Sequence, residues 1–228
     1  MKTLILIPTE LERSRLREAL GDHRSHGARL ELCGFGVVAS AARTASLLST
    51  EFFDHVVLVG IAGAIDPQLR VGDAYCFAEV ACHGIGAGEG PGFISAGAMG
   101  WSQWPGDPPN AAQEIGDVLP CHARAGGGVQ KDDGSAAANA GSGQLLTVCA
   151  ASGSDAELAT RRSLFPKAVA EDMEGFGVAT ACRMAGVPLG IIRGISNRAG
   201  NRDVATWRIA EALAAAGSLT RDYLKDLA

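Results

Sequence analysis

The sequence has few features that would direct a protein to nucleic acid or to a membrane. It contains no run of Lys and Arg, and its formal net charge of -5 opposes binding to a polyanion. The longest apolar stretches are too short to span a bilayer. No hydrophobic signal region with a cleavage site follows Met1. We therefore expect a cytoplasmic protein without nucleic acid or membrane partners.

Cysteines are few and isolated. The six cysteines stand at positions 33, 76, 82, 121, 149 and 182, and no two of them form a Cys-x-x-Cys pair. Such pairs are typical of zinc sites and of redox motifs. A reduced protein is the simple interpretation, and we expect neither a metal ion nor another cofactor.

What the sequence does contain is typical of a soluble globular domain. Hydrophobic residues make up 47% and charged residues 20% of the 228 positions. Strand-like stretches lie at residues 4–7, 30–33, 55–59, 73–80, 145–150 and 189–195. Helix-like stretches lie at residues 11–20, 37–48, 155–164, 173–185 and 204–224. This alternation predicts a three-layer α/β fold.

One stretch interrupts the alternation. Residues 84–143 are rich in Gly, Pro, Ala and Asn. We expect residues 106–143 to form a mobile loop. Strands before and after this loop are needed for one sheet, so we expect a single domain over residues 1–228.

Two polar pairs fall at the same predicted edge of the sheet. Met173 and Glu174 open a predicted helix, and Ser196 and Asn197 end the strand that follows it. Ligands of open α/β sheets bind just past the carboxyl ends of the strands. Two local explanations remain open. Acidic residues favour a helix N-terminus, and Asn197 is suited to a capping turn.

A third candidate follows the first strand. Thr9 and Glu12 have the spacing of a capping box, in which each side chain bonds the other residue's backbone N–H. A carboxylate at this edge of the sheet is also suited to activating water. The sequence leaves both interpretations of Glu12 open.

Glycine-rich turns provide weaker signals. Residues 60–63 read Gly-Ile-Ala-Gly after the third strand, where a close backbone approach to a ligand is possible. Gly34 and Gly36 also raise the possibility of a dinucleotide-binding domain. That possibility is weak, because no glycine-rich turn follows the first strand and the third glycine of the motif is absent.

Together these motifs resemble the nucleoside phosphorylase/nucleosidase family. The resemblance rests on Phe-Pro-x-Ala leading into Met173-Glu174, on the Gly-x-Ala-Gly loop, on Val-Gly-Asp at residues 71–73 and on Ile-Ser-Asn197. It implies an α/β/α sandwich around a mixed central sheet. It also implies that Glu12 orients the attacking water, that Met173 and Glu174 hold a ribose, and that Asn197 faces a purine.

Further motifs resemble the futalosine hydrolase branch of that family, whose members release hypoxanthine in a menaquinone pathway. They lie at residues 86–89, 92–95, 99–101, 193–197 and 201–203. Adenine-specific members have an aspartate where this chain has Asn197, and that aspartate can protonate N7 of the leaving base. Asparagine cannot give up a proton, but its N–H groups suit a 6-oxopurine, whose O6 and N7 are both acceptors. The resemblance covers residues 1–105 and 144–224.

The resemblance implies additional site residues and a homo-oligomer. Arg198 and Arg202 are candidates for binding a carboxylate at the far end of futalosine. We interpret Trp207 as a core aromatic. Catalysis is assigned to Glu12 and Asn197, and binding of the small-molecule nucleoside substrate to Met173, Glu174, Ala62, Gly63, Phe93, Ser152 and Arg202.

Three alternatives remain open. The chain could be a methylthioadenosine/adenosylhomocysteine nucleosidase, against which Asn197 argues. It could be a purine nucleoside phosphorylase, but such enzymes need cationic side chains for phosphate, and the predicted turns supply none. It could also bind hypoxanthine nucleosides without releasing a free base.

Overall fold

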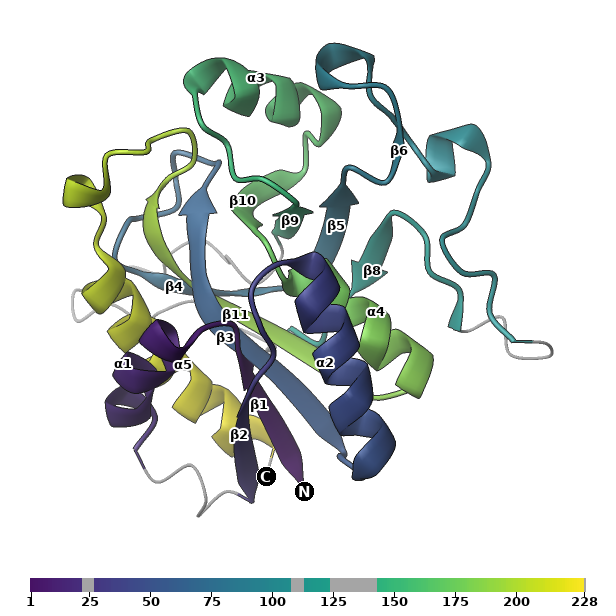
Figure 1. Ribbon diagram of the computed structural model, residues 1–228. Coiled ribbons are helices and arrows are strands. Elements are labelled where there is room, and N and C mark those ends of the chain that lie inside the picture. The colour runs from purple at the N-terminus through teal and green to yellow at the C-terminus, as the bar shows by residue number, and fades with distance from the viewer. Residues whose placement is uncertain (22–26, 108–112, 124–142, 228) are drawn as a thin grey trace.

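The computed structural model describes residues 1–21, 27–107, 113–123 and 143–227. Nine strands within these residues form one mixed sheet (Figure 1). They are β1 (Thr3–Ile7), β2 (Ala28–Leu32), β3 (His55–Ala64), β4 (Ala74–Phe77), β5 (Glu79–His83), β8 (Val118–Pro120), β9 (Gln144–Val148), β10 (Ala168–Asp172) and β11 (Leu189–Arg198). A separate pair comprises β6 (Gly86–Ala87) and β7 (Ile94–Ser95).

Strand β3 organises the sheet. Its first half pairs in parallel with β1, and its whole length runs parallel to β11. Its last two residues pair antiparallel with β10. β4 pairs with β11 and β5 pairs with β9, and only Ala78 separates β4 from β5, so this part of the chain links two arms of the sheet.

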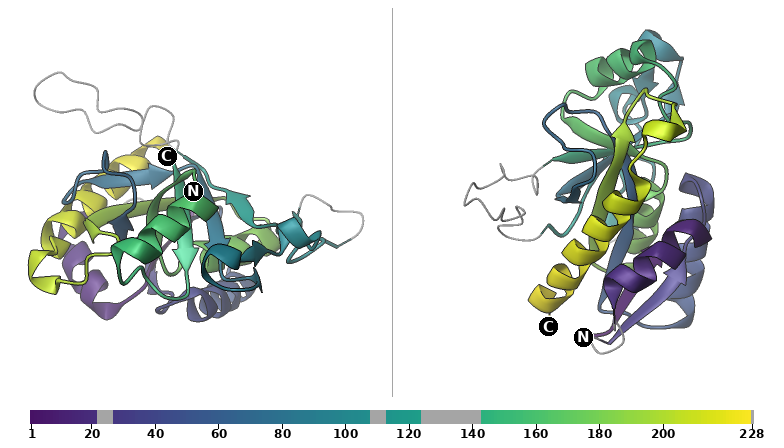
Figure 2. Two further views of the ribbon diagram at one scale, coloured as in Figure 1. Left: turned by 90° about the horizontal axis from the view of Figure 1, so that it is seen from above. Right: turned by 90° about the vertical axis from the view of Figure 1, so that its left-hand side faces the viewer.

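Helices cover both faces of the sheet (Figures 1 and 2). α1 (Glu10–Leu20) and α5 (Ile209–Leu227) pack together on one face, around a core that includes Leu16 and Leu213. α2 (Val37–Thr50) and α4 (Gly175–Ala185) pack together on the other, around a core that includes Leu47 and Phe176. β1 is apolar and buried throughout because both of its faces are covered.

The predicted α/β/α arrangement around a mixed sheet is confirmed, with local corrections. The helix expected from residue 173 begins at Gly175. The helix expected from residue 204 begins at Ile209, after a 3-10 turn at Val204–Thr206. The strand expected at 73–80 is divided between β4 and β5. α3 (Asp155–Leu164) agrees with its predicted bounds.

The predicted loop at 106–143 contains a strand. β8 pairs antiparallel with β5, and Ile115 forms an isolated bridge with Trp104. Residues 108–112 and 124–142 lie outside the described residues, so the mobility predicted for them stays a prediction. No helix in the described part of the chain is long and apolar enough to cross a membrane.

Candidate active site

A cavity of about 270 Å³ lies where β1, β3, β10 and β11 end. This volume is close to the lower end of the range for small-molecule sites. The cavity combines acidic and amide side chains with an apolar lining. Its walls are formed by Pro8, Thr9, Leu11, Glu12, Phe35, Ile61, Ala62, Gly63, Ala151, Glu171, Asp172, Met173, Glu174, Ser196, Asn197, Arg202 and Trp207.

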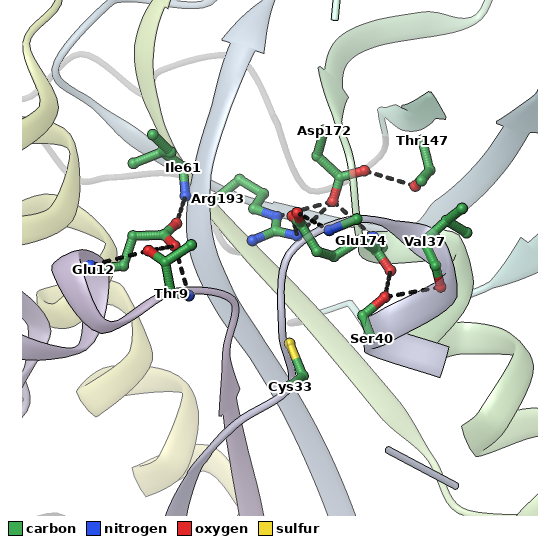
Figure 3. Close-up of polar contacts among 12 residues, drawn as sticks. Thr9, Glu12, Cys33, Val37, Ser40, Ile61, Thr147, Asp172, Glu174 and Arg193 are labelled. Carbon is green, nitrogen blue, oxygen red and sulfur yellow. Dashed lines mark hydrogen bonds and ion pairs between the residues drawn. The ribbon is translucent and has the colours of Figure 1, made fainter. Parts of the chain in front are cut away.

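Glu12 both completes the predicted cap and lies at the cavity. It forms the capping box with Thr9, whose hydroxyl donates to Glu12 Oε2 at 2.6 Å. Its other oxygen, Oε1, accepts from the backbone N–H of Ile61 at 3.1 Å. The side chain is buried and lines the cavity (Figure 3). The cap therefore fixes the carboxylate at the cavity instead of competing with a role there.

Arg193 lies between the acidic residues of the site (Figure 3). It is fully buried, and its Nε and Nη2 atoms donate to Asp172. Nη2 also donates to Glu174 Oε2 at 3.2 Å. Its third nitrogen, Nη1, has no hydrogen-bond partner among the described residues. An unpaired buried guanidinium N–H is costly, so this donor is available for a bound molecule.

Gly60 explains how this donor comes close to Glu12. A Cβ atom at Gly60 would lie 2.2 Å from Arg193 Nη1 and 2.7 Å from Glu12 Oε1. Arg193 Nη1 and Glu12 Oε1 therefore both lie close to the position that a side chain would occupy at residue 60, and glycine leaves this position empty. The arrangement presents a donor and an acceptor side by side, which are the two partners that one water molecule needs.

Glu174 and Asp172 differ in how completely they are bonded. Asp172 accepts from Arg193, from the Thr147 hydroxyl at 2.6 Å and from the backbone N–H of Gly175 at 2.8 Å. Within the part of the chain that the structure describes, Glu174 accepts only from Arg193 and, at 3.1 Å, from the backbone N–H of Gly36. Burial raises the pKa of Glu174 to about 7, although Arg193 opposes the rise. Glu174 retains acceptor capacity for a ligand.

Asn197 is buried and bonded at both ends of its amide. Its Oδ1 accepts from the Ser196 hydroxyl at 2.8 Å. Its Nδ2 donates to the carbonyl oxygen of Arg198 at 2.8 Å and to that of Asn201 at 3.5 Å. The second contact is long and weak. One amide N–H is therefore available to a ligand at little cost.

The remaining predicted binding residues divide into two groups. Ala62, Gly63, Met173 and Arg202 line the cavity. Phe93 and Ser152 do not line it. The ring of Phe93 packs edge-on against His83 at 4.7 Å, and Ser152 is buried behind the cavity wall.

The far end of the cavity differs from prediction. Trp207 is not a core aromatic: it is partly exposed, precedes α5 and lines the cavity. Arg202 lies 5.1 Å from its ring centre, a cation–π contact. Arg198 instead donates to the carbonyl oxygens of Asp66 and Pro67, which makes it structural.

Arg193 was not predicted as a site residue from the sequence. The available signal was a charge inside an otherwise apolar strand, since a buried charge requires a partner. Glu171, which lines the cavity, was not predicted as a site residue either. In the part of the chain that the structure describes, no group of three or more His, Cys, Asp or Glu side chains could hold a metal ion.

Comparisons with known proteins show the family to which the chain belongs. The chain matches the phosphorylase superfamily over residues 12–226. A futalosine hydrolase of Streptomyces coelicolor is 35% identical over 198 residues, which cover 83% of this chain and 75% of that protein. A 5'-methylthioadenosine/S-adenosylhomocysteine nucleosidase of Colwellia psychrerythraea is 30% identical over 224 residues, which cover 91% of this chain and 88% of that protein.

A solved nucleosidase structure has the same fold. It is a 5'-methylthioadenosine/S-adenosylhomocysteine nucleosidase of Colwellia psychrerythraea in complex with adenine. It aligns over 100% of this chain and 96% of its own, with 27% identity and a TM-score of 0.73. The predicted family resemblance is therefore confirmed. The chain belongs to the phosphorylase superfamily, in which futalosine hydrolases and methylthioadenosine/adenosylhomocysteine nucleosidases are among its relatives.

Proposed function

We propose that this protein is a purine nucleosidase that hydrolyses the N-ribosidic bond of futalosine and releases hypoxanthine. One observation carries the proposal: the buried carboxylate of Glu12 lines the cavity, and the unpaired Nη1 of Arg193 lies beside that carboxylate. The similarity to a futalosine hydrolase supports the choice of substrate. Such a reaction would place the protein in menaquinone biosynthesis.

The proposed mechanism uses each polar group once. Glu12 accepts a proton from a water molecule as the oxygen of that water attacks C1′ of the ribose. Arg193 Nη1 holds the same water. The bond from C1′ to the purine nitrogen breaks through an oxocarbenium-like state. Glu174 holds the ribose hydroxyls, and Met173 covers the sugar. Asn197 donates an N–H to the departing base, which takes its proton from solvent.

Water is a better nucleophile here than phosphate. Arg193 lies beside Glu12, but its charge is offset by its pairing with Asp172 and Glu174. A phosphate dianion beside Glu12 and Glu174 would face like charges, which disfavour binding. This arrangement argues against the phosphorylase alternative.

The second candidate is a methylthioadenosine/adenosylhomocysteine nucleosidase. The relative that covers 91% of this chain favours it. Incubation with futalosine, inosine and methylthioadenosine, followed by chromatography of the free base, separates the candidates. We expect rapid release of hypoxanthine from futalosine. Release of adenine from methylthioadenosine alone would favour the second candidate, and binding without release would indicate a non-catalytic protein.

We expect Glu174→Ala to abolish the preference for ribosides over 2′-deoxyribosides. Hydrogen bonds to a charged group contribute about 1.5–3 kcal/mol each, so the preference should fall by roughly tenfold or more. The measurement is kcat/KM for inosine and for 2′-deoxyinosine. An unchanged preference would remove Glu174 from the ribose site.

We expect Asn197→Asp to shift activity from hypoxanthine to adenine nucleosides. An aspartate accepts from the adenine amino group, whereas asparagine donates to N7 or O6 of hypoxanthine. The ratio of kcat/KM for inosine and adenosine should therefore fall. If the wild-type ratio persists, this side chain does not select the base.

We expect Arg202→Ala to weaken the binding of futalosine without weakening the binding of inosine. Arg202 lines the cavity and lies against Trp207, so its guanidinium is suited to a carboxylate on the substrate arm. KM for futalosine should rise by roughly tenfold, and Arg198→Ala is the matched control. Equal effects of Arg202→Ala on both substrates would exclude a carboxylate anchor at this position.

The homo-oligomer remains part of the proposal. Leu11 and Phe35 line the cavity yet are 54% and 63% exposed, and Val38 nearby is 79% exposed. Large exposed apolar side chains grouped in this way are typical of an interaction surface. We propose that a second copy of this chain covers them.

A further inference from the structure

A buried polar cluster behind the cavity has no role in the mechanism above. Glu171 Oε2 accepts from the Ser152 hydroxyl at 2.7 Å and from Arg161 Nη1 at 2.7 Å. Its Oε1 accepts from the backbone N–H of Ser152 at 2.8 Å. Arg161 Nη1 also donates to the Ser152 hydroxyl at 2.6 Å. Glu171, Ser152 and Arg161 are all buried.

The fold places this cluster beside the residue assigned to the base. Glu171 pairs with Gly63, and Gly63 pairs with Asn197, so the three lie in one row across β10, β3 and β11. Neighbouring strands are about 4.8 Å apart, which puts Glu171 and Asn197 roughly 10 Å apart along the row. A bicyclic base fits between them with a hydrogen bond on each side. Both residues line the cavity.

The carboxylate of Glu171 has one acceptor position left for a ligand. A carboxylate has about four acceptor positions and no donor. Two bonds occupy Oε2 and one occupies Oε1, so one position on Oε1 remains. The buried ion pair of Arg161 and Glu171 is expected to contribute little to stability by itself. Because Glu171 also lines the cavity, a role in binding is a better explanation for this pair.

We propose that Glu171 contacts N1 of the base and so selects a 6-oxopurine over a 6-aminopurine, in addition to the contact of Asn197 with N7 or O6. It accepts a hydrogen bond from N1–H, which 6-oxopurines have and 6-aminopurines lack. An adenine N1 would instead direct its lone pair at the carboxylate. Ser152 and Arg161 are positioning residues, since they hold Glu171 without contacting the base. This inference deepens the proposed function and rests on it for the identity of the nucleoside.

The test compares Glu171→Gln with wild-type protein in two assays. The first measures kcat/KM for futalosine and for its 6-amino analogue, which have the same arm and ribose. The second measures binding of free hypoxanthine and free adenine by calorimetry, which needs no hydrolysis. We expect the preference for the 6-oxo ligand to fall by roughly 10–100-fold in both assays, because glutamine can donate to N1 of adenine.

A purely structural role gives a different result. It would lower activity toward both nucleosides equally and leave both preferences unchanged, which would overturn the inference. If the unpaired Arg161 prevents Glu171→Gln from folding, the double variant Glu171→Gln, Arg161→Met removes both buried charges and is expected to lose the same preference. Glu18→Gln, at an exposed position of α1, is the control.

The two assays separate this inference from the proposed function. Protein that hydrolyses neither nucleoside but prefers hypoxanthine through Glu171 would contradict the function and support the inference. Protein that hydrolyses futalosine with a preference independent of Glu171 would do the reverse. Binding of neither base would overturn the inference.

Discussion

Glu12→Gln should reduce turnover of futalosine by roughly 10²–10⁴-fold, which is the usual contribution of a general base. It should leave the fold nearly unchanged. Glutamine at the third helical position can still complete the capping box with Thr9. It then loses the bond from Ile61, because its amide has one acceptor oxygen where the carboxylate has two. The variant therefore separates the chemical role of Glu12 from its structural role. The measurements are kcat at saturating substrate and the thermal melting temperature.

Glu18→Gln is the matched control for this substitution. Glu18 belongs to the same helix but is exposed, so its loss should change neither turnover nor melting temperature. A Glu12→Gln protein that melts at a lower temperature while keeping its turnover number would show that Glu12 is only a cap.

Arg193→Met should destabilise the protein by about 3–5 kcal/mol, the usual cost of removing one partner from a buried ion pair. Asp172 and Glu174 would both lose their guanidinium contacts in a site where Arg193 has no exposed surface. The measurement is the free energy of unfolding in urea. Activity should fall as well, because Nη1 no longer holds the water.

Arg29→Met provides the contrast. Arg29 bonds Glu31 and Glu51 at the surface, where ion pairs contribute little, so this variant should remain close to wild type. Arg193→Lys should be intermediate in stability, since lysine keeps the charge but loses the forked geometry. Arg193→Met protein as stable as the Arg29→Met control would refute the account of the buried pair.

Much of the fold could be predicted because the periodic signals are strong. Apolar runs such as β1 and β3 are covered on both faces, so they read directly as parallel strands. The boundaries were less predictable. Glu174 and residues 204–208 resemble helix in composition, but each precedes its helix, and Glu174 and Trp207 line the cavity.

The site could be predicted only where its residues follow strand ends. Glu12, Glu174 and Asn197 do so, and the structure brings all three to one cavity. Arg193 was missed because its importance depends on Asp172 and Glu174, which contact it only in the folded chain. Ser152 was assigned to the substrate but contacts Glu171 instead, a distinction that depends on side-chain direction.

The most direct test of the central claim is hydrolysis of futalosine in heavy-oxygen water. The products are analysed by mass spectrometry, with and without added phosphate. The account predicts free hypoxanthine and one heavy oxygen in the hydroxyl at C1′ of the sugar product, at a rate that phosphate does not change. An unlabelled sugar phosphate formed only in the presence of phosphate, or no release of base, would contradict it.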